Sequence, residues 1–439
     1  MKRLRAAVRS CTGLAQVIGL TLVCCMAAEA APETVRMDKA RFLDKCKGAY
    51  AGQMIGVSFG AETEWAWGVD GFLWQGQPNL GELLPWKPER ISNALKQDDC
   101  YVEMTFLKAL EQYGLDITPA QAGKAFAATK YELWHANLFG RENVRNGIMP
   151  PRSGNPRYNR HANDIDFQIE SDLFGILCPG LPRESNRLCD IFGHIMCYGD
   201  GVYGGMFIAG MYAAAYLEDQ NVRAVVEAGL ACIPKKSSYY QCIADVLRWH
   251  DECPSDWLAT WRKIETKWQD NLDCEPDIKA NINAKLNGAY VVAGLLYGNG
   301  DMARTLEVAT RCGQDSDCNP SSAAGILGCM KGFSKLGPQW TSGLDAIRNE
   351  KFSYADYSFD TLIEACQRVA EQVIRRAGGA VEPGGIDVDT AGHYTIPRQS
   401  AYPPKKIEQW SKDQSSIFNP SFLKARTHRS PASSFSASR

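Results

Sequence analysis

A pair of acidic residues lies just before a segment whose composition predicts a buried helix. Asp315 and Asp317 are two residues apart, and residues 323–332 are almost all small or apolar. The start of such a helix is buried, so the two carboxylates would repel each other and lose hydration. A divalent cation with oxygen ligands would offset that cost. The pattern therefore predicts a metal or catalytic site, with simple capping of the helix as the alternative.

The spacing of these acids excludes one common calcium site. Asp315, Asp317 and Asn319 fit the first three ligand positions of an EF-hand loop. Pro320, however, occupies the position that requires a turn glycine, and Ile326 stands where the bidentate glutamate belongs. An EF-hand is therefore ruled out.

Three segments in chain order resemble motifs of one enzyme family. Residues 313–328 resemble the signature G-G-D-T-D-T-N-A-x-x-A-G-A-x-x-G of the ADP-ribosylglycohydrolases, in particular the dinitrogenase-reductase-activating type. Residues 48–64 are similar to the opening helix of that family, and residues 97–100, Gln-Asp-Asp-Cys, stand where the family has T-D-D-T. The resemblance extends from about residue 44 to residue 332, with long insertions between the matched segments.

The resemblance implies an all-α fold, an orthogonal multi-helix bundle that holds two magnesium ions in a cleft. It also implies hydrolysis of a glycosidic bond at the anomeric carbon of ADP-ribose. Glu64 matches a glutamate at the edge of the cleft that is involved in metal binding and acid/base chemistry. Asp315 is also a catalytic candidate. The residues that match metal ligands are Asp98, Asp99, Asp315 and Asp317, and Gln97 can offer a further oxygen.

Two departures from the family motifs concern the metal ions. Gln97 and Cys318 stand where the family supplies threonine oxygens. A thiol is a poor ligand for magnesium, which argues against the second metal site. We expect one or two divalent cations, Mg²⁺ first, with Ca²⁺ or Mn²⁺ as alternatives.

The central segment departs from the family in its charge. Where the family has glycine and basic positions, this chain has Asp164, Asp166, Glu170 and Asp172. Acidic side chains are poorly suited to a pyrophosphate and suit the hydroxyls of a neutral sugar. We therefore predict that Glu170 and Asp172 bind substrate. We expect Glu64, or one of Asp164 and Asp166, to transfer the proton, and Glu64 is favoured. The alternative is a solvated helix face.

Aromatic and glycine-rich segments suggest further contacts. Trp65 and Trp67 lie in a loop rich in glycine and proline, where they could stack on a sugar ring or simply anchor the loop. Residues 199–204 satisfy G-x-G-x-x-G, but no strand precedes them, so a dinucleotide-binding enzyme is not favoured. We expect Asp200 to lie at a helix start that faces the cleft.

The chain divides into three parts. Residues 1–30 have the basic, apolar and small-residue regions of a secretory signal, residues 31–380 form one catalytic domain, and residues 381–439 are a Pro/Ser-rich extension that is partly disordered. Export predicts a periplasmic or extracellular protein whose substrate is a glycoside other than ADP-ribosylated protein. No later segment is apolar enough to span a membrane. A net charge of −2 gives no sign of a nucleic-acid partner.

The expected secondary structure is almost entirely helical. The periodicity predicts single helices over residues 93–113, 119–137 and 165–177, among others. Most cysteines occur in apolar helical patterns and are expected in the core, and a disulfide is most plausible among Cys232, Cys242, Cys253 and Cys274.

The sequence thus predicts a metal-dependent glycohydrolase that acts on a small-molecule or glycan substrate. The alternative is a non-catalytic sugar- or nucleoside-binding protein on the same fold. Calorimetry with divalent cations separates the two, because the second would bind none and hydrolyse nothing.

Overall fold

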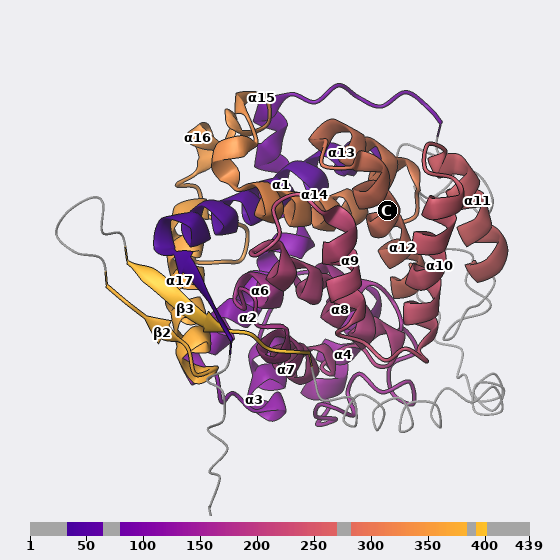
Figure 1. The fold of residues 1–439 in the computed structure, drawn as a ribbon. Coiled ribbons are helices and arrows are strands. Elements are labelled where there is room, and N and C mark those ends of the chain that lie inside the picture. Colours follow the sequence, from indigo (N-terminus) through magenta and orange to yellow (C-terminus); the bar gives the residue numbers. More distant parts are fainter. Residues whose placement is uncertain (1–32, 65–79, 270–281, 384–391, 402–439) are drawn as a thin grey trace, which may run out of the picture. The chain divides into compact units, whose positions relative to one another are not determined.

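The computed structural model describes residues 33–64, 80–269, 282–383 and 392–401. The predicted signal segment, Trp65, Trp67 and Cys274 therefore lie outside the described residues. Helices dominate the described part of the chain, which confirms the all-α fold class (Figure 1). The helices are α1 (Lys39–Glu64), η1 (Pro88–Lys96), α2 (Asp98–Tyr113), α3 (Pro119–Ala127), α4 (His135–Arg145), α5 (Asp166–Ile169), α6 (Asp172–Ile176), α7 (Pro182–Gly193), α8 (Asp200–Ala215), α9 (Val222–Leu230), α10 (Ser238–Glu252), α11 (Trp257–Trp268), α12 (Ala284–Gly298), α13 (Met302–Arg311), α14 (Cys318–Lys331), η2 (Phe333–Lys335), α15 (Pro338–Thr341), α16 (Leu344–Ile347) and α17 (Phe359–Arg376).

Helices α1 and α14 form the closest helix pair, and a stripe of glycines makes this contact possible. Gly48, Gly52, Gly56 and Gly60 recur every four residues and lie on one face of α1. A Cβ atom at any of them would collide with backbone atoms of α14 or of the residues just before it. Interdigitating rows of residues four apart are a common way for helices to pack, and small residues let the backbones approach closely. The antiparallel pairing places the start of α14 beside the end of α1.

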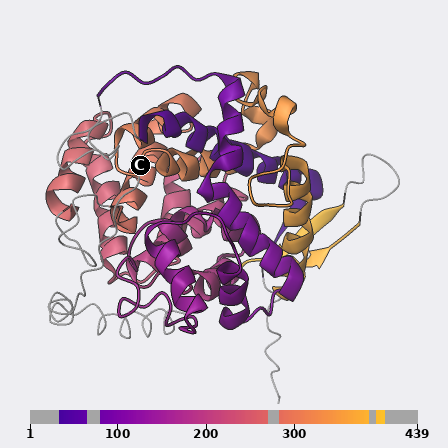
Figure 2. The same cartoon turned by 180° about the vertical axis from the view of Figure 1, so that it is seen from behind.

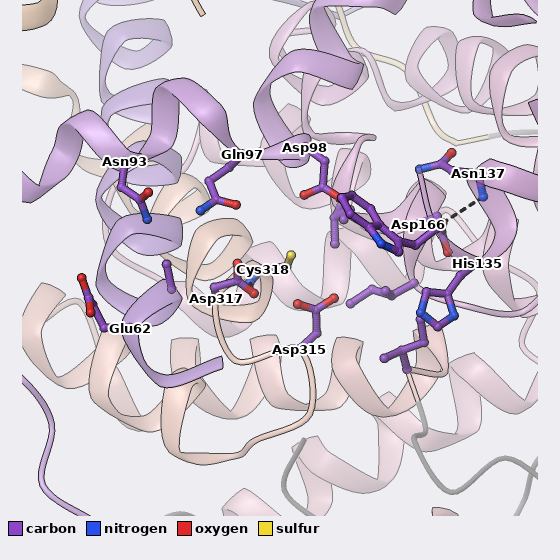
Figure 3. A pocket seen from close by; sticks show the side chains of 15 residues that line it. Glu62, Asn93, Gln97, Asp98, His135, Asn137, Asp166, Asp315, Asp317 and Cys318 are labelled. Atoms are coloured by element: carbon purple, nitrogen blue, oxygen red, sulfur yellow. Dashed lines mark hydrogen bonds between the residues drawn. The ribbon is translucent and has the colours of Figure 1, made fainter. Parts of the chain in front are cut away.

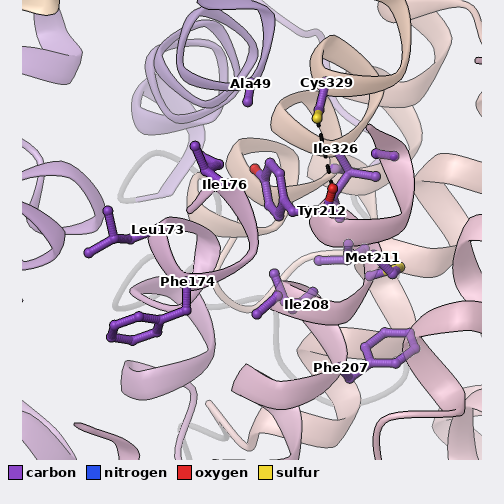
Figure 4. Packing of buried hydrophobic residues seen from close by; sticks show 14 of the residues in the cluster. Ala49, Leu173, Phe174, Ile176, Phe207, Ile208, Met211, Tyr212, Ile326 and Cys329 are labelled. Atoms are coloured by element: carbon purple, nitrogen blue, oxygen red, sulfur yellow. Dashed lines mark hydrogen bonds between the residues drawn. The ribbon is translucent and has the colours of Figure 1, made fainter. Parts of the chain in front are cut away.

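The core continues around α8, which is buried on nearly all sides. Its sequence is small and apolar all round, as expected for a helix that packs on several neighbours. Figure 4 shows side chains of α8 between those of α6 and α14, with Ala49 of α1 nearby. The Tyr212 hydroxyl lies so close to α14 that a Cβ at Gly325 would overlap it. These contacts connect the helices that carry the acidic residues.

A small antiparallel sheet joins the two ends of the described chain. Its strand order is β1 (Thr34–Asp38), β3 (His393–Pro397) and β2 (Ala380–Val381), and Met37 is paired with Tyr394 (Figures 1 and 2). Tyr394 and Ile396 are buried. Part of the segment that we predicted as a C-terminal extension is therefore a strand that packs on the helical domain.

Three of the predicted helices are interrupted, so these predictions were wrong in detail. The first breaks at Gln97, whose extended backbone separates η1 from α2. The break sets Asp98 and Asp99 in the first turn of α2, where the helix dipole favours acids. The second breaks between α3 and α4, and the third between α5 and α6 at Glu170 and Ser171. Periodicity alone does not reveal such breaks, because apolar residues continue on both sides of them.

The cysteines confirm one expectation and correct another. Those in the described residues are free thiols, and most are buried. Cys232, Cys242 and Cys253 form no disulfide and are free thiols. No helix in the described ranges is long and apolar enough to cross a membrane.

Candidate metal and catalytic site

The acids at the starts of α2 and α14 border one cavity of about 510 Å³ (Figure 3). Polar and acidic side chains line it together with apolar groups, among them three isoleucines. The lining residues are Ala61, Glu62, Asn93, Gln97, Asp98, Trp134, His135, Asn137, Ile165, Asp166, Ile169, Ile282, Asp315, Asp317 and Cys318. In Figure 3, Glu62 and Asn93 lie at one side, the acids of α2 and α14 in the middle, and His135, Asn137 and Asp166 at the other side.

Helix starts position the central acids. Asp317 is the N-cap of α14, and its Oδ1 accepts a hydrogen bond from the Cys318 amide at 2.9 Å. Asp98 accepts one from the Asp99 amide at 3.2 Å. The Cys318 thiol donates to Asp99 Oδ1, with a distance of 3.0 Å between the sulfur and the oxygen. The two helix starts therefore meet through the side chains of Asp99 and Cys318.

The carboxylates are held in an environment that disfavours their charge. Burial raises the pKa of Asp98 to about 6, and the negative charges of Asp317 and Asp166 add to the shift. Burial raises the pKa of Asp99 well above its ordinary value, and Asp98 and Asp317 raise it further. Burial also raises the pKa of Asp317. Without a cation, these acids favour protonation, as expected for like charges that share a poorly hydrated site.

The donor set fits a divalent cation. Ligand atoms of Asp98, Asp99 and Cys318 lie within 4.8 Å of one another, and so do those of Asp315, Asp317 and Cys318. Asp99 is fully buried, and within the described part of the chain its Oδ2 atom has no hydrogen-bond partner. A buried carboxylate oxygen without a partner is costly, and a bound cation would satisfy it.

A buried amide from α12 positions the loop that carries Asp315. The backbone of Gln314 has a φ of 54°, a left-handed conformation. Asn287 Oδ1 accepts hydrogen bonds from the Asp315 amide at 3.3 Å and from Asn319 Nδ2 at 2.8 Å, while Asn287 Nδ2 donates to Gln314 Oε1 at 3.2 Å. Asn287 therefore fixes the conformation of this turn through hydrogen bonds to three of its residues.

Asp166 lies at the other side of the cavity. Its Oδ1 accepts the Asn137 amide at 2.9 Å, and its Oδ2 is buried with no hydrogen-bond partner among the described residues. Burial raises the pKa of Asp166, and the charge of Asp164 adds to the effect, although His135 opposes it. Asp166 thus meets the structural requirements for a proton donor that faces the cavity.

Asp164 does not line the cavity. Its Oδ2 lies 2.6 Å from His161 Nδ1 and 3.5 Å from His135 Nδ1. Its carboxylate can orient the two imidazoles, and of these three residues only His135 lines the cavity.

The structure does not bring Glu170, Asp172 and Asp200 to the cavity. Glu170 is fully buried and accepts a hydrogen bond from Asn137 Nδ2. Asp172 is also fully buried and accepts the Tyr212 hydroxyl at 2.6 Å, and Asp200 is bonded to Ser238 Oγ. None of the three is among the residues that line the cavity. Glu170 and Asp172 are buried at the break between α5 and α6, and Asp200 lies at the start of α8, as expected.

The end of α1 contributes a different glutamate. Glu62 lines the cavity, whereas the position of the Glu64 side chain lies outside the described residues, as do Trp65 and Trp67. Trp134, the N-cap of α4, lines the cavity and is 49 % exposed, so it offers an aromatic face from a different element than the loop that we expected to provide one.

The sequence analysis did not identify four polar or aromatic lining residues. Asn93, Trp134, His135 and Asn137 lie near the breaks in the predicted helices. His135 begins α4 with a φ of 42°, a conformation that is uncommon for a non-glycine residue and often found at functional sites. Such a conformation leaves no mark in the sequence pattern.

Comparison with known protein families identifies the family of this chain. The sequence model of the ADP-ribosylglycohydrolases matches residues 38–377, a span that contains every described acid of the site. The chain belongs to the ADP-ribosylglycohydrolase family. A solved structure named as an ADP-ribosylglycohydrolase-related protein complex is similar at 15 % identity and a TM-score of 0.49, covering 75 % of this chain and 99 % of that one. No curated protein sequence matches. Membership confirms the resemblance found in the sequence and supports a hydrolase.

Proposed function

We propose that this ADP-ribosylglycohydrolase-family protein is a divalent-metal-dependent glycosidase that acts on a neutral glycoside outside the cytoplasm. The observation that carries the proposal is the meeting of two helix starts at one cavity, where burial raises the pKa of Asp98, Asp99 and Asp317, and the charge of Asp317 raises the pKa of Asp98 and Asp99 further. Proteins retain such a cluster at functional sites, because it is costly unless a cation or a reaction uses it.

The residues that would hold the cation are Asp98, Asp99, Asp315 and Asp317, with the Gln97 side chain beside them. A bound divalent cation supplies positive charge that orients sugar hydroxyls and lowers the pKa of a water molecule. Oxygen ligands suit Mg²⁺, Ca²⁺ or Mn²⁺. The start of each helix adds amide dipoles that keep these carboxylates in place.

Asp166 is our first choice for the proton-transfer group. Hydrolysis at an anomeric carbon needs an acid for the leaving oxygen and an activated water. The raised pKa of Asp166 keeps a proton on its carboxyl at higher pH than usual, and the Asn137 amide fixes the orientation of that carboxyl. The alternatives are Glu62, which lies at the opposite side of the cavity, and Glu64.

The charge of the cavity favours a neutral sugar. Among its described lining residues are Glu62, Asp98, Asp166, Asp315 and Asp317, and none is a lysine or an arginine. A pyrophosphate would meet carboxylates there in place of the basic groups that phosphates prefer. The exposed face of Trp134 can stack on a sugar ring. A ribosyl or other furanoside met after export is consistent with this surface and with the predicted signal.

The test compares two helix-capping aspartates. Asp317 caps α14 at the cavity, and Asp301 caps α13 away from it, accepting the Arg304 amide at 2.7 Å. Asparagine caps helices about as well as aspartate, so Asp317→Asn and Asp301→Asn should both fold. Purified proteins would be screened against nitrophenyl glycosides, nucleosides and ADP-ribosyl-arginine with added Mg²⁺, Ca²⁺ or Mn²⁺. We expect only Asp317→Asn to lose metal binding and turnover.

Two outcomes would change the assignment. Equal turnover in Asp317→Asn and the wild type would remove the acids from the reaction, and efficient hydrolysis of ADP-ribosyl-arginine alone would reverse the substrate preference. One observation favours the non-catalytic alternative, a sugar-binding protein, because Cys318 replaces a threonine oxygen of the family motif. Sugar binding by the wild type without any metal binding or hydrolysis would support that alternative.

A further inference from the structure

Cys318 occupies the centre of the acidic cluster. It is the first residue of α14, is 5 % exposed and lines the cavity. Figure 3 shows its sulfur among Asp98, Asp317 and Asp315. Its Sγ atom belongs to both groups of ligand atoms that lie within 4.8 Å of one another, one with Asp98 and Asp99 and the other with Asp315 and Asp317.

The distances suit coordination by sulfur. A metal–sulfur bond is about 2.3 Å long and a metal–oxygen bond about 2.0–2.2 Å, so two ligands of one ion lie at most roughly 4.5 Å apart. The Sγ atom is 3.0 Å from Asp99 Oδ1, so the thiol already points at the carboxylates. Asp99 Oδ2, buried and without a hydrogen-bond partner among the described residues, is a second ligand atom at the same place.

Cys318 also has apolar neighbours. Cys318 packs in a cluster with Ile165, Ile169 and Ile282. Magnesium dehydrates reluctantly and usually keeps several waters, and it binds oxygen in preference to sulfur. A thiolate ligand beside these isoleucines, which also line the cavity, therefore suits a softer ion than magnesium.

From these contacts we infer that Cys318 is a metal ligand and that the site selects a thiolate-accepting transition metal of the Zn²⁺ class over Mg²⁺. The inference rests on the proposed function, in which the surrounding acids hold a divalent cation. As the metal–sulfur bond forms, the thiol gives up its proton to solvent, and the acids of α2 and α14 complete the coordination. Carboxylates alone also bind Zn²⁺ more tightly than Mg²⁺, so the selectivity has to be judged by the effect of removing the sulfur.

The experiment uses the full chain and two cysteine positions. Cys318→Thr replaces the thiol with a hydroxyl on a side chain of similar volume, and Cys318→Ser replaces it with a hydroxyl on a smaller side chain. Cys253→Ser removes a thiol at the C-cap of α10 as a control. Zn²⁺ and Mg²⁺ affinities would be measured by calorimetry, and Co²⁺ would be added as a spectroscopic probe. Circular dichroism would verify that each variant is folded.

We expect the Co²⁺ form of the wild type and of Cys253→Ser to show a thiolate-to-metal charge-transfer band, and both Cys318 variants to lack it. The ratio of Zn²⁺ to Mg²⁺ affinity should fall in the Cys318 variants by about 10-fold or more, since even the loss of an outer-shell partner costs about 10–100-fold. A bound Co²⁺ without this band, together with an unchanged ratio in the variants, would overturn the inference and leave the proposed function intact. Absence of any bound cation, with no hydrolysis, would overturn both.

Discussion

Replacement of Asp172 by asparagine tests whether this acid contacts substrate or belongs to the protein interior. Asp172 is fully buried, accepts the Tyr212 hydroxyl at 2.6 Å, and lies in a network with Gln53 and Glu103. Burial raises the pKa of Asp172 from 3.8 to about 8, against the opposing effect of its hydrogen bonds. Asparagine keeps the shape and one acceptor oxygen, and it carries no charge.

The raised pKa fixes the sign and size of the effect on stability. Between about pH 4 and pH 8 the folded protein holds a proton on Asp172 that the unfolded chain releases, so the wild-type free energy of unfolding falls as pH rises. Each unit of pKa shift corresponds to about 1.4 kcal/mol. The variant should therefore gain stability relative to the wild type by about 1.4 kcal/mol per pH unit, reaching roughly 5 kcal/mol near pH 8.

Urea unfolding, followed by circular dichroism at several pH values from 5 to 8.5 in the presence of a chelator, measures this difference. Glu350→Gln removes an exposed acid and serves as the control, and its effect should stay within about 0.5 kcal/mol at every pH. Turnover and metal affinity of Asp172→Asn at pH 6 should remain within a few-fold of the wild type. Parallel stability curves for Asp172→Asn and the wild type, with activity lost, would refute the reasoning and return Asp172 to the substrate site.

Three further predictions concern the helix pair and the cavity. Gly52→Val should destabilise the protein by about 1–3 kcal/mol in urea unfolding, because its side chain would meet the backbone at Ala324; an unchanged midpoint would contradict the packing. Asp166→Asn should lower turnover by about 10²-fold or more, abolish the decline of activity at high pH, and leave metal affinity within a few-fold in calorimetry. Glu64→Gln tests the alternative: a loss of turnover of about 10²-fold or more would assign proton transfer to Glu64, and a wild-type rate in this variant beside an inactive Glu62→Gln would assign it to Glu62.

The sequence by itself determined the family, the all-α class and the acids of α2 and α14. These inferences rest on local patterns: glycines four residues apart, acid pairs at helix starts, and small residues in a buried helix. Gly52 is recognised by the glycines four residues before and after it, and Asp317 by the acid two residues before it and the small-residue helix after it. Such patterns can be recognised in the sequence, because helix packing and helix capping depend on residues a few positions apart.

Only the tertiary structure decided which acids face the cavity. Asp166 and Glu170 are four residues apart near one helix break, yet Asp166 lines the cavity and Glu170 is buried against Asn137. Asn137 and Trp134 come from α4 and its start, and nothing in their neighbourhood marks them as site residues. Orientation around a break depends on contacts between helices far apart in the chain. The burial of the site acids, the raised pKa of Asp98 and the contact of Cys318 with Asp99 all arise from this packing between helices. No single segment of the sequence contains the information that predicts them.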